Sequence, residues 1–366
     1  MGPGPGRATV VERFSRTCHL PYIVGCLVIA VLIGPPGMIL VAYFSTGFDI
    51  EQALLMTIMA IGGVGTPYVM GAAIIVLSSL LIFFFIFMTG FMRQVLISAE
   101  QGIIPILPEG ENTFHNSFKL IFSPWPPLII SAVVSAFAII SSIDYLIASF
   151  GTYMVNVATG AYMVIIYPLW IVVACYFAWM YFGSIYGLYK IGKKPLRLRP
   201  STEDRMLGVR PFGDLSLSLS TAYFSTMVIM ILMGVAGTIG SPLIGFVPYM
   251  TNLMIFLIVG VVLFISPLYA IHKKMVEQKE VERNELRKQA YRSVEGRGAY
   301  SADDTVAEMQ RRLDSITSLM ALEMAEKNLN SIPDWPIDTK ILNRFATIMI
   351  TVIAIVIGNL ILRLIA

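Results

Sequence analysis

Hydrophobic residues in this chain are gathered into long blocks, which short polar connections separate. Each block offers about 20 residues or more, enough for an α-helix rising about 1.5 Å per residue to cross roughly 30 Å of hydrocarbon. The pattern therefore predicts an all-α, polytopic membrane protein with seven transmembrane helices. The blocks are Leu20–Phe44, Pro67–Met92, Pro126–Ser149, Ala161–Tyr189, Leu217–Gly240, Met250–Ile271 and Leu342–Leu364.

Two local features modify this pattern near the N-terminus. Gly34-Pro35-Pro36 lies inside the first block, and we expect it to kink that helix because proline removes a backbone donor and clashes with the preceding turn. The apolar stretch within Asp49–Gly63 is too short to cross a bilayer. It predicts an extracellular or interfacial helix.

Basic residues fall on alternate connections and so predict the orientation. The connections Ser45–Thr66, Phe150–Gly160 and Ser241–Tyr249 contain no lysine or arginine. Since cytoplasmic connections are enriched in lysine and arginine, the N-terminus is expected inside and the C-terminus outside. The basic residues close to the block ends on the other side are Arg7, Arg13, Arg16, Arg93, Lys119, Lys190, Lys193, Lys194, Arg197, Arg199, Arg205, Arg210, Lys273, Lys274, Lys340 and, at the start of the last block, Arg344.

Composition agrees with a membrane location. Only 13% of the residues are charged, against roughly 25% in soluble domains, and the mean hydropathy is +0.75. The net charge of +3 is small, and we expect the lipid bilayer, not nucleic acid, as the partner. The three cysteines and three histidines show no metal-ligand spacing, so neither a metal nor a cofactor is expected.

The predicted organisation has four parts. Residues 1–19 form a cytoplasmic tail, residues 20–271 a six-helix transmembrane region, residues 272–341 a cytoplasmic helical hairpin with its linker, and residues 342–366 the seventh transmembrane helix. The hairpin is predicted because a charged helix after the sixth block is interrupted at Glu295–Gly298 and restarts near Ser301.

An apolar seam follows 3-4-3-4 spacing along the second helix of the expected hairpin. Such a narrow seam suits packing on the first helix or on a neighbouring subunit. The Trp335-Pro336 linker that follows is interpreted either as an interfacial anchor or as a stiff element that transmits motion to the last helix. The seam residues are Val306, Met309, Leu313, Ile316 and Met320.

Chemistry-bearing residues are scarce inside the apolar blocks. Asp144 is the one acid within a block, near the outer end of the third, where it is either solvated at the interface or part of an ion-coupling site. The sequence contains no Gly-x-Ser-x-Gly, His-Glu-x-x-His, Walker or dinucleotide motif. We therefore expect the protein not to be an enzyme.

The last block carries a small, mildly polar face. Thr347, Thr351, Ala354 and Gly358 recur at 4-3-4 spacing. Arg344 lies at the inner end of this face and Asn359 borders it, whereas Met349, Val352, Val356 and Leu360 lie opposite. The face suits either close helix packing through small residues or the wall of a pore surrounded by several copies.

The connection before the fifth block carries a short motif made of Asp204, Arg205, Gly208, Pro211 and Gly213. With these residues it resembles a loop in uncharacterised prokaryotic multi-pass membrane proteins, which carry a Pro-Asp-Arg-x-x-Gly-Leu-x-Pro-Leu-Gly type of pattern before a span. The Trp335-Pro336 linker is also similar to that group, and the resemblance implies the cell membrane of a prokaryote. In topology alone, the chain is similar to insect odorant and gustatory receptor channels.

These features favour an oligomeric membrane channel in which the last helix lines the pore and the hairpin holds the subunits together. A structural or accessory subunit of a larger membrane complex is the first alternative, and a solute transporter is the second. The expected protein partners are further copies of this chain or other membrane proteins.

Overall fold

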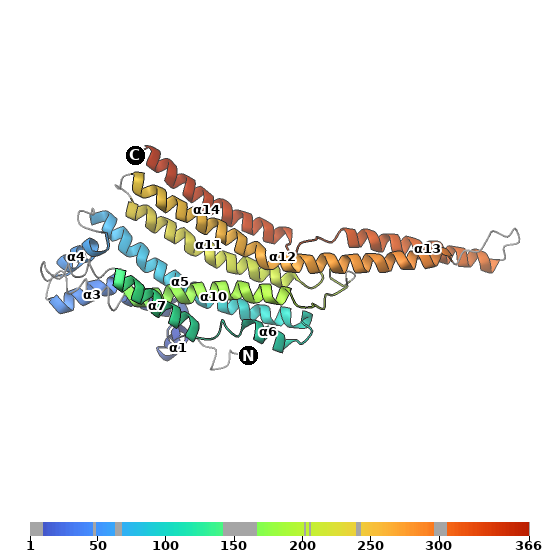
Figure 1. The fold of residues 1–366 in the computed structure, drawn as a ribbon, viewed down its shortest axis with the longest axis horizontal. Helices are drawn as coiled ribbons and strands as arrows, with labels where there is room; N and C mark the ends of the chain where they lie inside the picture. Colours follow the sequence, from blue (N-terminus) through green and yellow to red (C-terminus); the bar gives the residue numbers. More distant parts are fainter. Residues whose placement is uncertain are drawn as a thin grey trace.

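The computed structural model describes residues 10–46, 49–62, 68–141, 167–200, 203–204, 206–238, 243–295 and 306–365. Every regular element within these residues is a helix, so the expected all-α class is confirmed for this part of the chain. Figure 1 shows a bundle of long helices from which one helical hairpin projects.

Helices long and apolar enough to cross a membrane make up most of the bundle. Five qualify within the described residues. They are α5 (Tyr68–Ile103), α10 (Tyr167–Gly192), α11 (Arg210–Thr238), α12 (Leu243–Glu295) and α14 (Thr339–Ile365). Two shorter apolar helices, α2 (Tyr22–Ile33) and α7 (Trp125–Ser141), lie beside them.

The remaining elements are short or polar. They are α1 (Val10–Thr17), α3 (Pro35–Thr46), α4 (Ile50–Gly62), the 3-10 helix η2 (Ile104–Ile106), α6 (Glu111–Phe118) and α13 (Val306–Asn330). The helix α4 occupies the short apolar stretch that the sequence predicts to be helical.

The first apolar block is broken into two helices, where the sequence predicts one kinked helix. α2 ends at Ile33, Gly34 adopts an extended conformation with ψ −177°, and α3 begins at Pro35. Each helix has 12 residues, which is about 18 Å at a rise of 1.5 Å per residue. Neither helix alone is long enough to span a bilayer. The break falls here because Pro35 has no N–H with which to continue the hydrogen bonding of α2.

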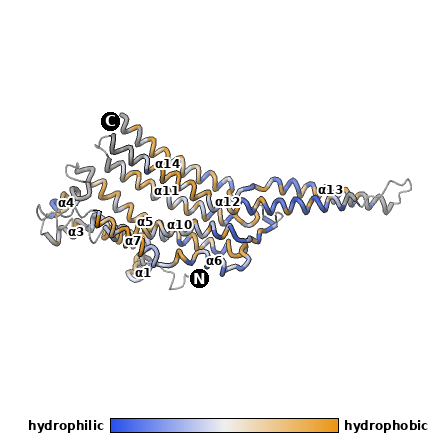
Figure 2. Tube along the Cα trace, viewed as in Figure 1, coloured by the Kyte–Doolittle hydropathy of each residue, from blue (hydrophilic) through white to orange (hydrophobic). Residues whose placement is uncertain are grey.

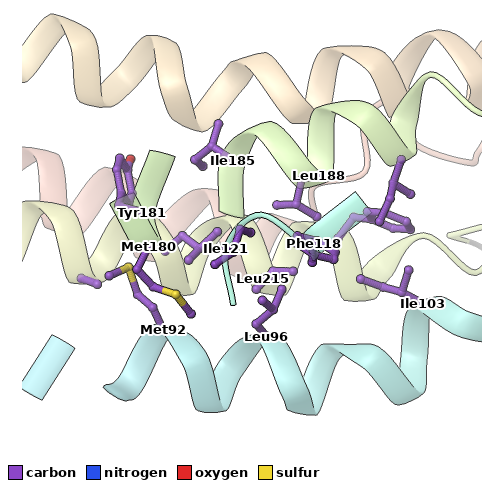
Figure 3. Packing of buried hydrophobic residues seen from close by; sticks show 14 of the residues in the cluster. Met92, Leu96, Ile103, Phe118, Ile121, Met180, Tyr181, Ile185, Leu188 and Leu215 are labelled. Carbon is purple, nitrogen blue, oxygen red and sulfur yellow. The ribbon is translucent and has the colours of Figure 1, made fainter. Parts of the chain in front are cut away.

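The apolar core lies where α5, α10 and α11 meet, and it extends to α6. Its buried side chains include Met92 and Leu96 of α5, Phe118 of α6 and Leu188 of α10 (Figure 3). Most of the largest fully buried side chains among the described residues belong to this core.

The helix α12 continues far beyond the bundle, and α13 folds back along it (Figure 1). Figure 2 shows that hydrophobic residues dominate within the bundle and hydrophilic residues along much of the projecting hairpin. The composition of α12 thus changes along a single helix, from apolar within the bundle to charged along the hairpin.

Candidate functional site

The linker between α13 and α14, residues 331–338, is anchored to α12 by a buried lysine. The Nζ atom of Lys279 donates hydrogen bonds to the backbone oxygen of Ile332 at 2.5 Å and to Oδ1 of Asp334 at 2.6 Å. The Lys279 side chain is only 8% exposed, so its ammonium group depends on these two acceptors. The hydrogen bond from Lys279 also holds the pKa of Asp334 below its ordinary value of 3.8.

An aromatic stack adds a second contact between the linker and α12. The rings of His272 and Trp335 lie 4.4 Å apart and are inclined by only 11°. Nδ1 of His272 lies 2.6 Å from the backbone oxygen of Asp334. Because a carbonyl oxygen only accepts, Nδ1 carries the proton in this contact. The sequence indicated the Trp335-Pro336 linker but gave no sign of this partner.

A third contact joins the linker to α11. A Cβ atom on Gly213 would lie 2.4 Å from the backbone oxygen of Pro336 and 3.0 Å from Cδ1 of Ile341. No side chain fits between them, so glycine is what allows α11 and the linker to approach so closely. The entry to α14 is therefore held by both α11 and α12.

The ion pair at this entry gives a testable prediction. Asp334→Ala removes an acceptor from the buried Lys279, and we expect it to loosen the linker by about 1 kcal/mol, or roughly fivefold, because the carboxylate is largely exposed and screened. Hydrogen–deuterium exchange of residues 331–338 measures this change. Glu280→Ala, an exposed acid on α12, is the control and should leave the exchange unaltered.

The same ion pair should respond to acid. The pKa of Asp334 is lowered in the folded protein. The stabilisation of the linker by the Lys279–Asp334 ion pair is therefore complete above the ordinary pKa of 3.8, and it is lost as the pH falls through the lowered pKa. Linker exchange, corrected for its intrinsic pH dependence, should rise in that acidic range in the wild-type protein. The Asp334→Ala variant should lack this rise.

One side of α14 packs on the bundle. Val352 and Val356 are buried against Phe224, Met227 and Ile231 of α11. This is the side that the sequence placed opposite the small polar face, and neighbouring helices cover it. α14 is nevertheless the least buried of the described helices that are long enough to span a membrane, because only 17% of its most apolar 18 residues are buried.

The small polar face of α14 points away from the bundle. Thr347 and Thr351 are exposed, and their hydroxyls donate to the helix's own carbonyls, at Asn343 and Thr347, over 2.8 and 2.9 Å. Ala354 is exposed as well, and a Cβ on Gly358 would meet nothing within 4 Å. No other described helix of this chain packs against the face.

Isoleucines occupy the neighbouring part of the exposed surface of α14. Ile350, Ile353, Ile357 and Ile361 are 67%, 41%, 50% and 49% exposed. Branched aliphatic side chains are suited to contact with lipid acyl chains. A stripe of threonine, alanine and glycine is more typical of surfaces that contact other helices. The exposed surface of α14 is therefore divided into two stripes of different character.

Of the other predicted site residues in the membrane-spanning part, the structure describes some only in part. Arg344 is exposed near the start of α14. Asn359 belongs to the helix, but its side chain lies outside the described residues, and Asp144 lies outside them entirely.

The hairpin packs through residues other than the predicted seam. Leu329 is buried, and Arg283 of α12 bonds Asn330 of α13 at 2.6 Å. Leu313, Ile316 and Met320 are 61%, 47% and 60% exposed, so the seam does not face α12. Met324, which is 67% exposed, extends it by one turn, whereas the side chains of Val306 and Met309 lie outside the described part.

The loop before α11 is built around Asp204. Its carboxylate accepts the backbone N–H groups of Met206 and Gly208 at 2.9 and 3.0 Å. Gly208 has a φ of +83°, which favours glycine. Pro211 contacts Gly102, and Arg205 lies outside the described residues. The motif that carries the family resemblance thus has a structural role in this chain.

A partly buried ion pair was missed by sequence reasoning. Nη1 of Arg93 on α5 lies 2.6 Å from Oε2 of Glu12 on α1, and the two side chains are 5% and 15% exposed. A cavity of about 740 Å³ borders the pair. No local signal could reveal it, because the partners are 81 residues apart in sequence.

A second missed cluster joins α5 and α6. Nε2 of His115 lies 3.0 Å from Glu111 and 3.4 Å from Glu100, and the ligand atoms all fall within 4.8 Å of one another. These three residues could hold a metal ion. The signal available in the sequence was the four-residue spacing of Glu111 and His115 on one helix.

The apolar helices of spanning length define this chain as an integral membrane protein built on a helical bundle. No family model, curated protein or solved structure matches it. The resemblance of the Asp204 loop to prokaryotic membrane proteins therefore stays a prediction.

Proposed function

We propose that this protein is a homo-oligomeric membrane channel in which α14 of each subunit lines the pore. The observation that carries the proposal is the outward direction of the Thr347, Thr351, Ala354 and Gly358 face. Threonine hydroxyls that are already bonded within their own helix leave an oxygen lone pair for water or a passing ion. Several copies of this face around an axis would enclose a mildly polar path.

The exposed seam on α13 supports an oligomer. Leu313, Ile316, Met320 and Met324 lie on the hydrophilic hairpin, where water would otherwise cover them. Contiguous exposed apolar surface of this kind is typical of protein interfaces. In the proposed assembly, the seam joins hairpins of neighbouring subunits, and the anchored linker connects each hairpin to the start of α14.

The proposed topology has seven crossings, with the N-terminus inside and the C-terminus outside. Besides the five long helices, one crossing is made by α2 and α3 together and another by α7 with the residues that follow it. The placement of basic residues supports this orientation, because the connections without lysine or arginine then all lie outside.

Cysteine labelling tests the orientation. Gln52→Cys in α4 should react with an impermeant thiol reagent added to intact cells, and Asn116→Cys in α6 should react only after permeabilisation. Both positions are exposed, whereas Thr57 on α4 is fully buried and would be a poor probe. Cys18, Cys26 and Cys175 are first replaced. External labelling of Asn116→Cys would contradict the topology.

Purification and reconstitution test the function. The proposal expects a stable homo-oligomer that allows passive ion flux across liposomes. A monomer without flux would instead support an accessory subunit of a larger complex. Flux of a solute that saturates and accumulates against its gradient would support a transporter.

A further inference from the structure

A pocket of about 470 Å³ lies between α10, α11 and α12 in the membrane-spanning part of the bundle. Phe177 and Ala178 line it from α10, Met227 from α11 and Phe256 from α12. Its wall is mostly aromatic and aliphatic, with Asn252 and Thr226 among its few polar members. Its size falls within the range of roughly 300–1,000 Å³ that ligand sites occupy. It is separate from the small polar face of α14.

The pocket contains a buried hydroxyl group with no acceptor. Tyr181, also in the lining, is 1% exposed, and its phenolic oxygen has no hydrogen-bond partner. Figure 3 shows that oxygen at the side of the ring turned away from Met92. The other hydroxyls of the lining are used, since Tyr223 donates to Phe256 and Thr226 to Ala222. An unpaired donor in an apolar setting costs free energy, which an acceptor on a ligand would restore.

The pocket reaches the surface that faces lipid. Phe182, Met230 and Ile255 line it and are 48%, 41% and 53% exposed on helices of spanning length. A molecule dissolved in the bilayer can therefore enter without passing through water. Tyr181 lies near the middle of α10, about 16 Å along the helix from its end at Gly192.

We infer that this pocket binds a lipophilic carbonyl compound from the membrane. Its apolar body fills the space between the aromatic side chains, and its carbonyl oxygen accepts the hydrogen bond of Tyr181. The stacked rings of Tyr181 and Tyr223, with centroids 4.9 Å apart, hold the hydroxyl in place. The inference does not depend on channel activity, because binding can be measured on a protein that conducts nothing.

Photolabelling tests this inference. The probe is a long-chain ketone that carries a diazirine and an alkyne, added to the purified full-length protein in lipid nanodiscs. We expect cross-links in the segments of α10, α11 and α12 that line the pocket. Excess unlabelled ketone should displace the probe, whereas an alkane of equal length should compete at least tenfold less well. Even labelling of all lipid-facing helices, or equal competition by the alkane, would overturn the inference.

Three variants sharpen the test. Tyr181→Phe keeps the ring but removes the hydroxyl, and we expect roughly tenfold weaker labelling, as for one lost hydrogen bond. Ala178→Trp should fill the pocket and abolish labelling. Tyr186→Phe removes a hydroxyl from the exposed side of the same helix and should change nothing. Unchanged labelling in both pocket variants would show that the molecule binds elsewhere.

Discussion

Leu313→Asp combined with Ile316→Asp is expected to dissociate the protein into monomers while its helices remain folded and inserted. Both side chains are exposed in the single chain, at 61% and 47%, so the new carboxylates would meet water there. In an interface between subunits the same carboxylates would be desolvated. That costs several kcal/mol, and about 3 kcal/mol already weakens association roughly hundredfold. The mass of the purified protein, measured by light scattering, gives the result.

A matched variant controls for added charge. Ala321→Asp places a carboxylate on the same helix, at an exposed position away from the seam. We expect this variant to assemble like the wild-type protein. If the double variant also remains oligomeric, the seam is not an interface and the role proposed for the hairpin is wrong.

Thr351→Lys is the second variant with a large expected effect. In a pore, the ammonium group points into water, so the protein folds, but its positive charge repels cations. Two like charges about 4 Å apart in bulk water repel each other by about 1 kcal/mol, and a ring of several lysines multiplies this repulsion. We expect cation flux to fall by roughly tenfold or more, and the reversal potential in a salt gradient to shift toward anion preference.

The alternative for Thr351→Lys has a distinct outcome. In a dry helix interface, the lysine costs roughly 2.5–3.5 kcal/mol on insertion scales, and the protein would misassemble. Gly358→Leu complements the test. The single chain leaves open space at that position, so the larger side chain should be tolerated in the wall of a pore but should disrupt a close helix interface. Val352→Lys, at a buried position against α11, should fail to fold in either case.

The sequence predicted what depends on local patterning. Runs of apolar residues predicted where long helices occur, and the interruption after Glu295 predicted the hairpin. The break between Ile33 and Pro35 was underestimated as a kink, because two successive prolines follow a glycine that adopts an extended conformation. Helical periodicity also grouped Val352 with Val356 correctly, since both contribute to the same buried cluster.

Periodicity says which residues share a face, but not what covers that face. Leu313 and Ile316 could equally have packed on α12, and the exposure of their side chains decides against it. Contacts between distant segments were invisible for the same reason. Lys279 and Asp334 are 55 residues apart, and nothing near either one predicts the other.

Glycines show the same limit in another form. Gly208 and Gly213 belong to the same sequence motif, but each position requires glycine for a different reason. Gly208 adopts a positive φ, and Gly213 leaves room for the carbonyl of Pro336 more than 100 residues further along the chain. The first reason is local and follows from turn chemistry, whereas the second requires the packed structure.

Current recordings from planar bilayers, made with single cysteines in a cysteine-free protein, test most directly whether α14 lines a pore. A positively charged thiol reagent should reduce the current through Thr351→Cys, because that side chain would face the conducting path. The same reagent should leave the current through Ile353→Cys unaffected, because that residue is 41% exposed on the isoleucine stripe, which the proposed assembly turns toward lipid. A parent protein that passes no current, or a conducting Thr351→Cys protein that the reagent does not block, would contradict the account.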